Sequence, residues 1–262
     1  MTKVDRLSLS FLLFSLLFLG FLLLPLSVLL VSNPLKSLIN GLFSKEVMNA
    51  ITLSLYTGML TALLSVLFGT PLAYLLATKK FPGKEFIETT IEVPILLPHI
   101  VSGIALLLII GRYGLIGRPL SFLGIRFTRT ILGTIAAQFF VSSPFYIRSA
   151  EEGFKSIDPE LRNVARCCGA TPFRAFLDID LPLCARAMFS GVILTWARAI
   201  SEFSAVIVIS YHPLVAPTLV YEYFLTKGFY ASLIPAALLE IVSLGVFALL
   251  KIIQTRSFWS YS

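Results

Sequence analysis

The chain has 262 residues, of which 57% are hydrophobic and only 13% are charged, and its formal net charge is +7. Soluble domains carry about 25% charged residues, so this composition excludes an ordinary soluble globular protein. The mean hydropathy is +0.89, and the apolar residues come in runs near the roughly 20 residues that cross a bilayer. The sequence therefore predicts an all-α, polytopic membrane protein.

Hydropathy predicts six transmembrane helices, at residues 9–31, 48–78, 91–111, 130–149, 183–210 and 232–253. The first follows Lys3 and Arg6, but its apolar run exceeds the roughly 7–15 residues of a signal peptide, so we interpret it as a retained helix. We expect one structural unit, in which residues 1–46 hold the first helix and an external linker. Residues 47–256 then form a core of five helices, and residues 150–182 form a cytoplasmic loop within that core.

The distribution of lysine and arginine favours a cytoplasmic position for both termini. Four arginines do not fit this trend, because they lie in the loop between the third and fourth helices, which this topology places outside. They are Arg112, Arg118, Arg126 and Arg129. They could belong to a solvated loop that faces the lipid headgroups. Alternatively, they form an external basic mouth that attracts anions or docks an acidic partner.

The loop at residues 150–182 has the spacing of two short amphipathic helices. Asp158 is a favoured N-cap, and Pro159 suits the first helical turn, where Glu160 complements the helix dipole. Apolar side chains then recur at helical spacing on one face: Leu161, Val164, Ala165 and Cys168. The first helix is predicted to end at Gly169, a common position for glycine.

Thr171 and Pro172 predict a second helix, which we expect to run through about Leu177. Amphipathic helices of this kind can lie in the membrane interface. The small side chains from Ala165 to Ala170 favour the alternative that another protein docks closely here.

Two charged residues, Arg198 and Glu202, fall inside the fifth predicted span. A charge at mid-membrane costs at least roughly 2.5–3.5 kcal/mol, and their i, i+4 spacing lets the two side chains meet on one face of a helix. The pair could fix the packing of helices. Alternatively, Arg198 faces the transport pathway as a transient anion contact.

The loop also carries a motif. Gly169, then nine residues, then Ile179, one residue, and Leu181-Pro182 is similar to the signature loop of ABC importer permeases. The leading triplet is Asn163-Val164-Ala165, in which the Glu and the first Ala of the family signature are replaced. The resemblance implies a type I ABC importer permease fold, in which this loop docks on a separate ATP-hydrolysing subunit. The residues assigned to coupling are Asp158, Glu160, Leu161, Arg162, Asn163, Val164, Ala165, Arg166, Cys168, Gly169, Ala170, Thr171, Ile179, Leu181 and Pro182.

Three further stretches resemble the molybdate/tungstate branch of this family, particularly its archaeal-type members. They are residues 211–222, residues 81–84 and residues 97–99, and the segment around Arg198 and Glu202 resembles permeases for tetrahedral oxyanions in general. Sulfate and thiosulfate permeases share that last segment. Because molybdate and sulfate have the same shape and charge, a sulfate or thiosulfate permease is the alternative.

The resemblance implies two copies of a cytoplasmic ABC ATPase and an external oxyanion-binding protein as partners, besides membrane lipid and no nucleic acid. A homodimer is expected because six helices are too few to enclose a pathway. The chain contains no phosphate-binding G-x-x-x-x-G-K-[ST] motif. We therefore expect ATP and Mg in the partner subunit, with no cofactor, metal or catalytic residue in this chain.

A membrane-embedded enzyme, such as an intramembrane protease, is the alternative from another class. It would need a serine near a histidine or two aspartates in the spans, and the predicted spans contain no aspartate. A purely structural anchor would not need intramembrane charges.

Overall fold

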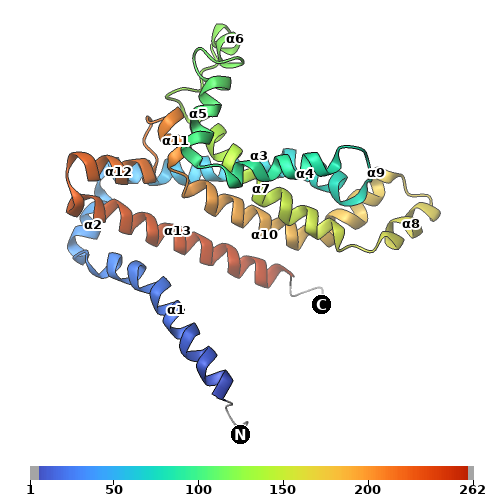
Figure 1. The fold of residues 1–262 in the computed structure, drawn as a ribbon, viewed down its shortest axis with the longest axis horizontal. Helices are drawn as coiled ribbons and strands as arrows, with labels where there is room; N and C mark the ends of the chain where they lie inside the picture. Colours follow the sequence, from blue (N-terminus) through green and yellow to red (C-terminus); the bar gives the residue numbers. More distant parts are fainter. Residues whose placement is uncertain (1–5, 259–262) are drawn as a thin grey trace.

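The computed structural model describes residues 6–258, and every regular element in this range is a helix (Figure 1). Lys3 lies outside the described residues, as do the side chains of Arg6 and Arg256. The elements are α1 (Arg6–Val31), α2 (Leu35–Phe43), α3 (Lys45–Thr78), α4 (Lys84–Leu96), α5 (His99–Ile110), α6 (Gly117–Phe122), α7 (Ile131–Lys155), α8 (Pro159–Cys167), α9 (Pro172–Ala175), a π-helical segment (Phe176–Asp180), α10 (Leu181–Ile200), α11 (Ser204–Ile209), α12 (Ala216–Thr226) and α13 (Phe229–Phe258).

Within residues 6–258, three helices are long and apolar enough to cross a membrane: Leu9–Val31 within α1, the whole of α3, and Phe229–Thr255 within α13. They match the first, second and sixth predicted spans, and the bent pair of α4 and α5 raises the number to four. The fourth and fifth predicted spans correspond to α7 and α10, which carry polar or charged side chains such as Gln138 and Arg198. The predicted count of six is therefore not reproduced by length and composition alone.

The third predicted span, over residues 91–111, is broken in the structure. The chain forms α4 and α5 instead, which meet at an angle of 114°. Leu97 has an extended backbone with φ −75° and ψ 141°, which is the conformation favoured before a proline. Pro98 follows it, so the helix ends at Leu96 and a new one begins at His99.

The fifth predicted span is also interrupted. It was expected over residues 183–210, but α10 begins two residues earlier, at Leu181, and ends at Ile200. Residues 201–203 form a break, and the short α11 follows. The helices α2, α6 and α12 lie in segments where no helix was predicted.

The core of the molecule is the packing of α3, α7 and α10 against one another. Tyr146 and Phe154 of α7 are buried in the largest apolar cluster, with Leu76 of α3. The approach of α7 to α10 is close, because a Cβ atom at Gly153 would lie 2.5 Å from the Cβ atom of Ala187. Small residues allow membrane helices to pack at such short distances.

The helices divide into a bundle and two projecting parts. In Figure 1, α8 and α9 lie at one end of the bundle, and α2 and α12 lie at the opposite end. The segment of α5 and α6 projects to one side of the bundle, and α1 diverges from it. Phe14, Leu17 and Phe21 of α1 are 71%, 71% and 74% exposed, and the helix exposes apolar side chains on all its faces.

Candidate functional site

The first helix of the predicted coupling loop, residues 150–182, begins as the sequence indicated. Asp158 is the N-cap of α8, and its Oδ1 accepts a hydrogen bond from the backbone N–H of Glu160 at 2.9 Å. Pro159 is the first helical residue. The cap side chain thus accepts a hydrogen bond from one of the backbone N–H groups that lack a partner within the helix at its first turn.

The glycine turn is formed by Gly169, whose φ of +90° is unfavourable for any residue with a Cβ atom. The backbone N–H of Ala170 donates to the carbonyl of Ala165 at 3.0 Å, and that of Gly169 donates to the carbonyl of Arg166 at 3.0 Å. These two bonds form a Schellman motif, which satisfies the last carbonyls of α8. No other atom lies within 4 Å of a Cβ placed at Gly169, so the backbone angle is what requires glycine.

The second helix is shorter than predicted. Thr171 caps α9 by accepting a hydrogen bond from the backbone N–H of Arg174 at 3.2 Å, but α9 ends at Ala175 rather than near Leu177. The chain continues through the π-helical segment directly into α10. The coupling loop and the fifth predicted span are therefore joined without a break, and Pro182 lies in the first turn of α10.

The apolar face of α8 is not covered by any of the residues that the structure describes. Leu161 and Val164 are 45% and 62% exposed, and α8 contains no buried residue. Phe173 of α9, in the same loop, is 69% exposed. Of the remaining predicted coupling residues, Asn163, Arg166, Cys168 and Pro182 are exposed, whereas Ala165, Ala170, Ile179 and Leu181 are half-buried.

Arg162 differs from its neighbours on α8, because its side chain points back to the bundle. Its Nε lies 2.5 Å from Oδ1 of Asp180, which is fully buried at the end of the π-helical segment. The hydroxyl group of Tyr74, on α3, donates to Oδ2 of Asp180 at 3.1 Å. Arg162 was among the predicted coupling residues, whereas Asp180 and Tyr74 were not. The only sequence signal was a carboxylate between the apolar residues Ile179 and Leu181.

The predicted contact between Arg198 and Glu202 is present. Nη2 of Arg198 donates to Oε2 of Glu202 at 2.6 Å, and the side chains are 22% and 1% exposed. The other carboxylate oxygen, Oε1, accepts a hydrogen bond from the backbone N–H of Ala205 at 2.8 Å, in the first turn of α11. Glu202 therefore joins the end of α10 to the start of α11, across the break at residues 201–203.

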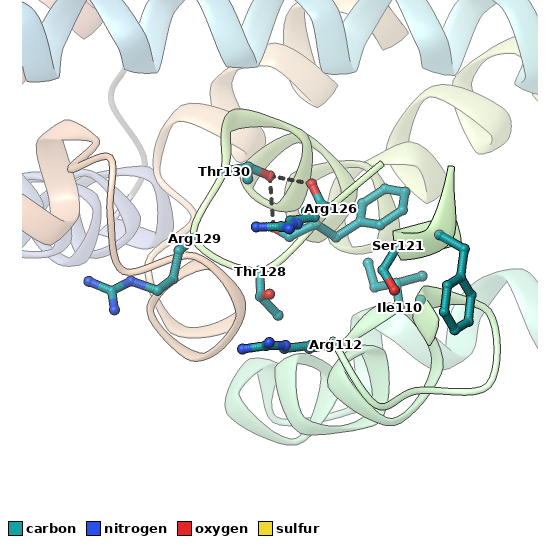
Figure 2. Close-up of a pocket in the computed structure, with 10 residues that line it drawn as sticks. Ile110, Arg112, Ser121, Arg126, Thr128, Arg129 and Thr130 are labelled. Atoms are coloured by element: carbon teal, nitrogen blue, oxygen red, sulfur yellow. Dashed lines mark hydrogen bonds between the residues drawn. The ribbon is translucent and has the colours of Figure 1, made fainter. Parts of the chain in front are cut away.

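Three of the four arginines in the loop between the third and fourth predicted spans line one pocket of about 550 Å³ between the α5–α6 segment and the start of α7. We call it the arginine pocket, and it contains Arg112, Arg126 and Arg129 but not Arg118. Figure 2 shows Arg112 and Arg126 on opposite sides of Thr128, with the guanidinium group of Arg129 directed away from both. The sequence contains no Asp or Glu between residues 92 and 151, so this segment contributes no carboxylate that could neutralise the pocket.

Comparison with known proteins gives the family. Residues 65–258 match the family described as "Binding-protein-dependent transport system inner membrane component". The chain belongs to this family. It is a membrane component of a transport system, not an enzyme.

Curated relatives of the chain include permease proteins of molybdate/tungstate and sulfate transport systems. The chain is 40% identical to the molybdate/tungstate transport system permease protein WtpB of Thermococcus kodakarensis over 233 residues, 87% of either chain. It is also 40% identical to WtpB of Pyrococcus abyssi, covering 87% of this chain and 88% of the relative. A probable sulfate transport system permease protein, cysT of Nephroselmis olivacea, is 31% identical and covers 77% of this chain and 73% of its own length.

Solved structures support the fold. A bacterial ABC transporter involved in the import of the acidic polysaccharide alginate superposes with a TM-score of 0.75 at 19% identity, over 96% of both chains. The MetNI methionine ABC transporter superposes with a TM-score of 0.64 at 15% identity, over 82% of this chain and 96% of the other. The predicted type I ABC importer permease fold is confirmed by these neighbours.

Proposed function

We propose that this chain is the permease subunit of an ABC importer that translocates molybdate or tungstate by alternating access. The observation that carries the proposal is the 40% identity to WtpB over 87% of both chains. The probable sulfate permeases are more distant, at 31% identity and lower coverage, which disfavours sulfate or thiosulfate as the substrate.

The proposed assembly is a homodimer of this chain with two cytoplasmic ATPase subunits and an external oxyanion-binding protein. ATP and Mg bind in the ATPase, and this chain holds no cofactor of its own. Both termini lie on the cytoplasmic side, in the domain arrangement of residues 1–46, 47–256 and 150–182 predicted from sequence. Closure of the two ATPases on ATP moves the two coupling loops and opens the helices outward, and hydrolysis reverses the movement.

The substrate is tested by reconstituting the complex with its binding protein in liposomes. Molybdate and tungstate should each stimulate ATP hydrolysis and accumulate inside the vesicles, whereas sulfate at the same concentration should do neither. Stimulation by sulfate without stimulation by molybdate or tungstate would refute the proposed substrate. Because the oxyanions share shape and charge, both the binding protein and the permease must be present in the assay.

The coupling loop is proposed as the docking surface for the ATPase. Its support is the apolar face of α8, on which Leu161 and Val164 are 45% and 62% exposed. Exposed apolar patches next to polar residues mark interaction sites. A lipid-facing helix would also expose apolar side chains, but the Schellman turn at Gly169 and the cap at Asp158 give α8 two defined ends that a groove can recognise.

A charge placed on this face tests the docking. Val164→Asp should abolish copurification of the ATPase, because the new carboxylate would be buried without a partner in the interface. Ser156→Asp is the matched control, since it adds the same charge at an exposed position just before α8. Equal recovery of the ATPase with both variants would contradict the assignment of α8 as the docking helix.

The arginine pocket is proposed as the external basic mouth that attracts the oxyanion. Arg112, Arg126 and Arg129 add positive charge to one recess, and such charge raises association rates of anions by roughly 10- to 1,000-fold. Replacing all three by glutamine should slow uptake of the oxyanion at low ionic strength. At high salt the variant and the wild-type protein should take it up at the same rate. Arg118→Gln, outside the pocket, is the control, and unchanged uptake kinetics in the triple variant would exclude the role and favour a headgroup-facing loop.

A further inference from the structure

The attachment of α8 to the transmembrane helices depends on very few side chains. None of the residues of α8 is buried, so apolar packing contributes little to holding this helix in place. Arg162 is the exception among them, because it reaches the buried carboxylate of Asp180 and is only 16% exposed at its side chain. A force applied to α8 by a docked partner must pass through the contacts that α8 makes with the rest of the chain.

The ion pair of Arg162 is centred on Asp180. One carboxylate oxygen lies 2.5 Å from Nε of Arg162, and the other accepts the hydrogen bond from the hydroxyl group of Tyr74 at 3.1 Å. Asp180 is fully buried and is followed directly by the first residue of α10. The two oxygens of one carboxylate therefore connect α8 to α3 at the point where α10 begins.

The same residues reach α7. Nη2 of Arg162 donates to the backbone carbonyl of Phe154, near the end of α7, at 3.3 Å. The ring of Tyr74 packs edge-on against the rings of Phe154 and Phe176, with centroid distances of 5.3 Å and 4.8 Å. Arg162, Asp180 and Tyr74, which we call the α8 anchor, thus touch all three helices of the bundle core.

The loop also contains a second ion pair that lacks these properties. Nε of Arg174 lies 3.4 Å from Oδ2 of Asp178, and the two side chains are 76% and 65% exposed. Exposed pairs contribute little, because water and salt screen them. A buried carboxylate, in contrast, has to keep its partner, since an unpaired buried charge is strongly unfavourable. This contrast supplies a matched control within the same loop.

We propose that Arg162, Asp180 and Tyr74 are positioning residues that transmit the displacement of α8 to α3, α7 and α10. The inference rests on the proposed function, because it assumes that an ATPase moves α8. It goes beyond docking, since these side chains face the bundle and not the partner. The π-helical segment that ends at Asp180 agrees with this role, because π-helical turns are frequently found at functional sites.

The experiment uses the complete complex with the ATPase and the binding protein in liposomes, with molybdate as the probe. The key variant is Arg162→Met combined with Asp180→Leu, which removes both charges and leaves neither one buried and unpaired. Copurified ATPase should stay close to the wild-type amount, because the side chain of Arg162 is directed to Asp180 and not to the partner. Stimulation of hydrolysis by molybdate and the loaded binding protein should fall about tenfold, within the range of coupling between two sites.

Two further variants separate coupling from stability. Arg162→Lys with Asp180 retained keeps the positive charge and should show more stimulation than the double variant. Arg174→Met should show the same stimulation as the wild-type protein. Wild-type stimulation in the double variant would overturn the proposal, as would loss of the ATPase from it, which would show that Arg162 docks the partner. A wild-type complex that no oxyanion stimulates would instead refute the proposed function, and the anchor role with it.

Discussion

One double-mutant cycle on Arg198 and Glu202 separates the two interpretations of this pair, as an ion pair that fixes helix packing or as an anion contact made by Arg198. Glu202 is 1% exposed, so a substitution of Arg198 by methionine leaves its carboxylate buried with one remaining donor, the backbone N–H of Ala205. Breaking a buried ion pair costs about 3–5 kcal/mol. Glu202→Gln should cost less, because Arg198 is 22% exposed and can reach water, and because the glutamine carbonyl can still accept the Ala205 bond.

The double variant, Arg198→Met with Glu202→Gln, should be more stable than Arg198→Met alone. It has no unpaired charge, and replacing a buried ion pair by neutral side chains is often close to neutral. For a chain of this length, a loss of about 3 kcal/mol lowers the unfolding midpoint by roughly 6–12 °C. Thermal unfolding of the purified protein in detergent would measure the four midpoints, and their non-additivity gives the interaction energy of the pair.

Transport by the same variants completes the test. If the pair fixes the turn between α10 and α11, molybdate uptake should follow the unfolding midpoints and recover in the double variant. An Arg198→Met protein with an unchanged midpoint but no uptake would refute this reasoning. The same result in the double variant would make Arg198 an anion contact.

Three other substitutions have defined outcomes. Gly153→Ala places a Cβ atom 2.5 Å from the Cβ atom of Ala187 and should destabilise the protein by about 1–3 kcal/mol, which a lower unfolding midpoint would show. The control is Gly245→Ala, whose new Cβ meets no atom within 4 Å and which should not lower the midpoint. Gly169→Ala should weaken ATPase binding about fivefold, because a left-handed backbone costs an alanine about 1 kcal/mol. If titrations gave the variant and the wild-type protein the same affinity for the ATPase, the need for a φ of +90° at this position would be contradicted. Asp158→Ala should cost about 1 kcal/mol of helix stability and speed amide hydrogen exchange at the start of α8, and unchanged exchange would contradict the cap.

Local features of the coupling loop could be predicted from the sequence, because they depend on neighbours in the chain. The cap at Asp158, the turn at Gly169 and the cap at Thr171 each involve residues within a few positions of one another. Composition and hydropathy likewise decide that the protein is helical and lies in a membrane, since these properties are sums over residues. The i, i+4 contact of Arg198 and Glu202 is local in the same sense.

The α8 anchor and the bend between α4 and α5 were decided only by the tertiary structure. Arg162 meets Asp180 across 18 positions, and Asp180 meets Tyr74 across 106, so no periodicity or motif relates them. Pro98 interrupts the helix locally, but the angle of 114° between α4 and α5 depends on what these helices pack against. The sequence by itself thus determined the class of protein and the ends of its loop helices. The fold alone decided which buried carboxylate holds the loop to the bundle, because burial and pairing arise when distant helices come together.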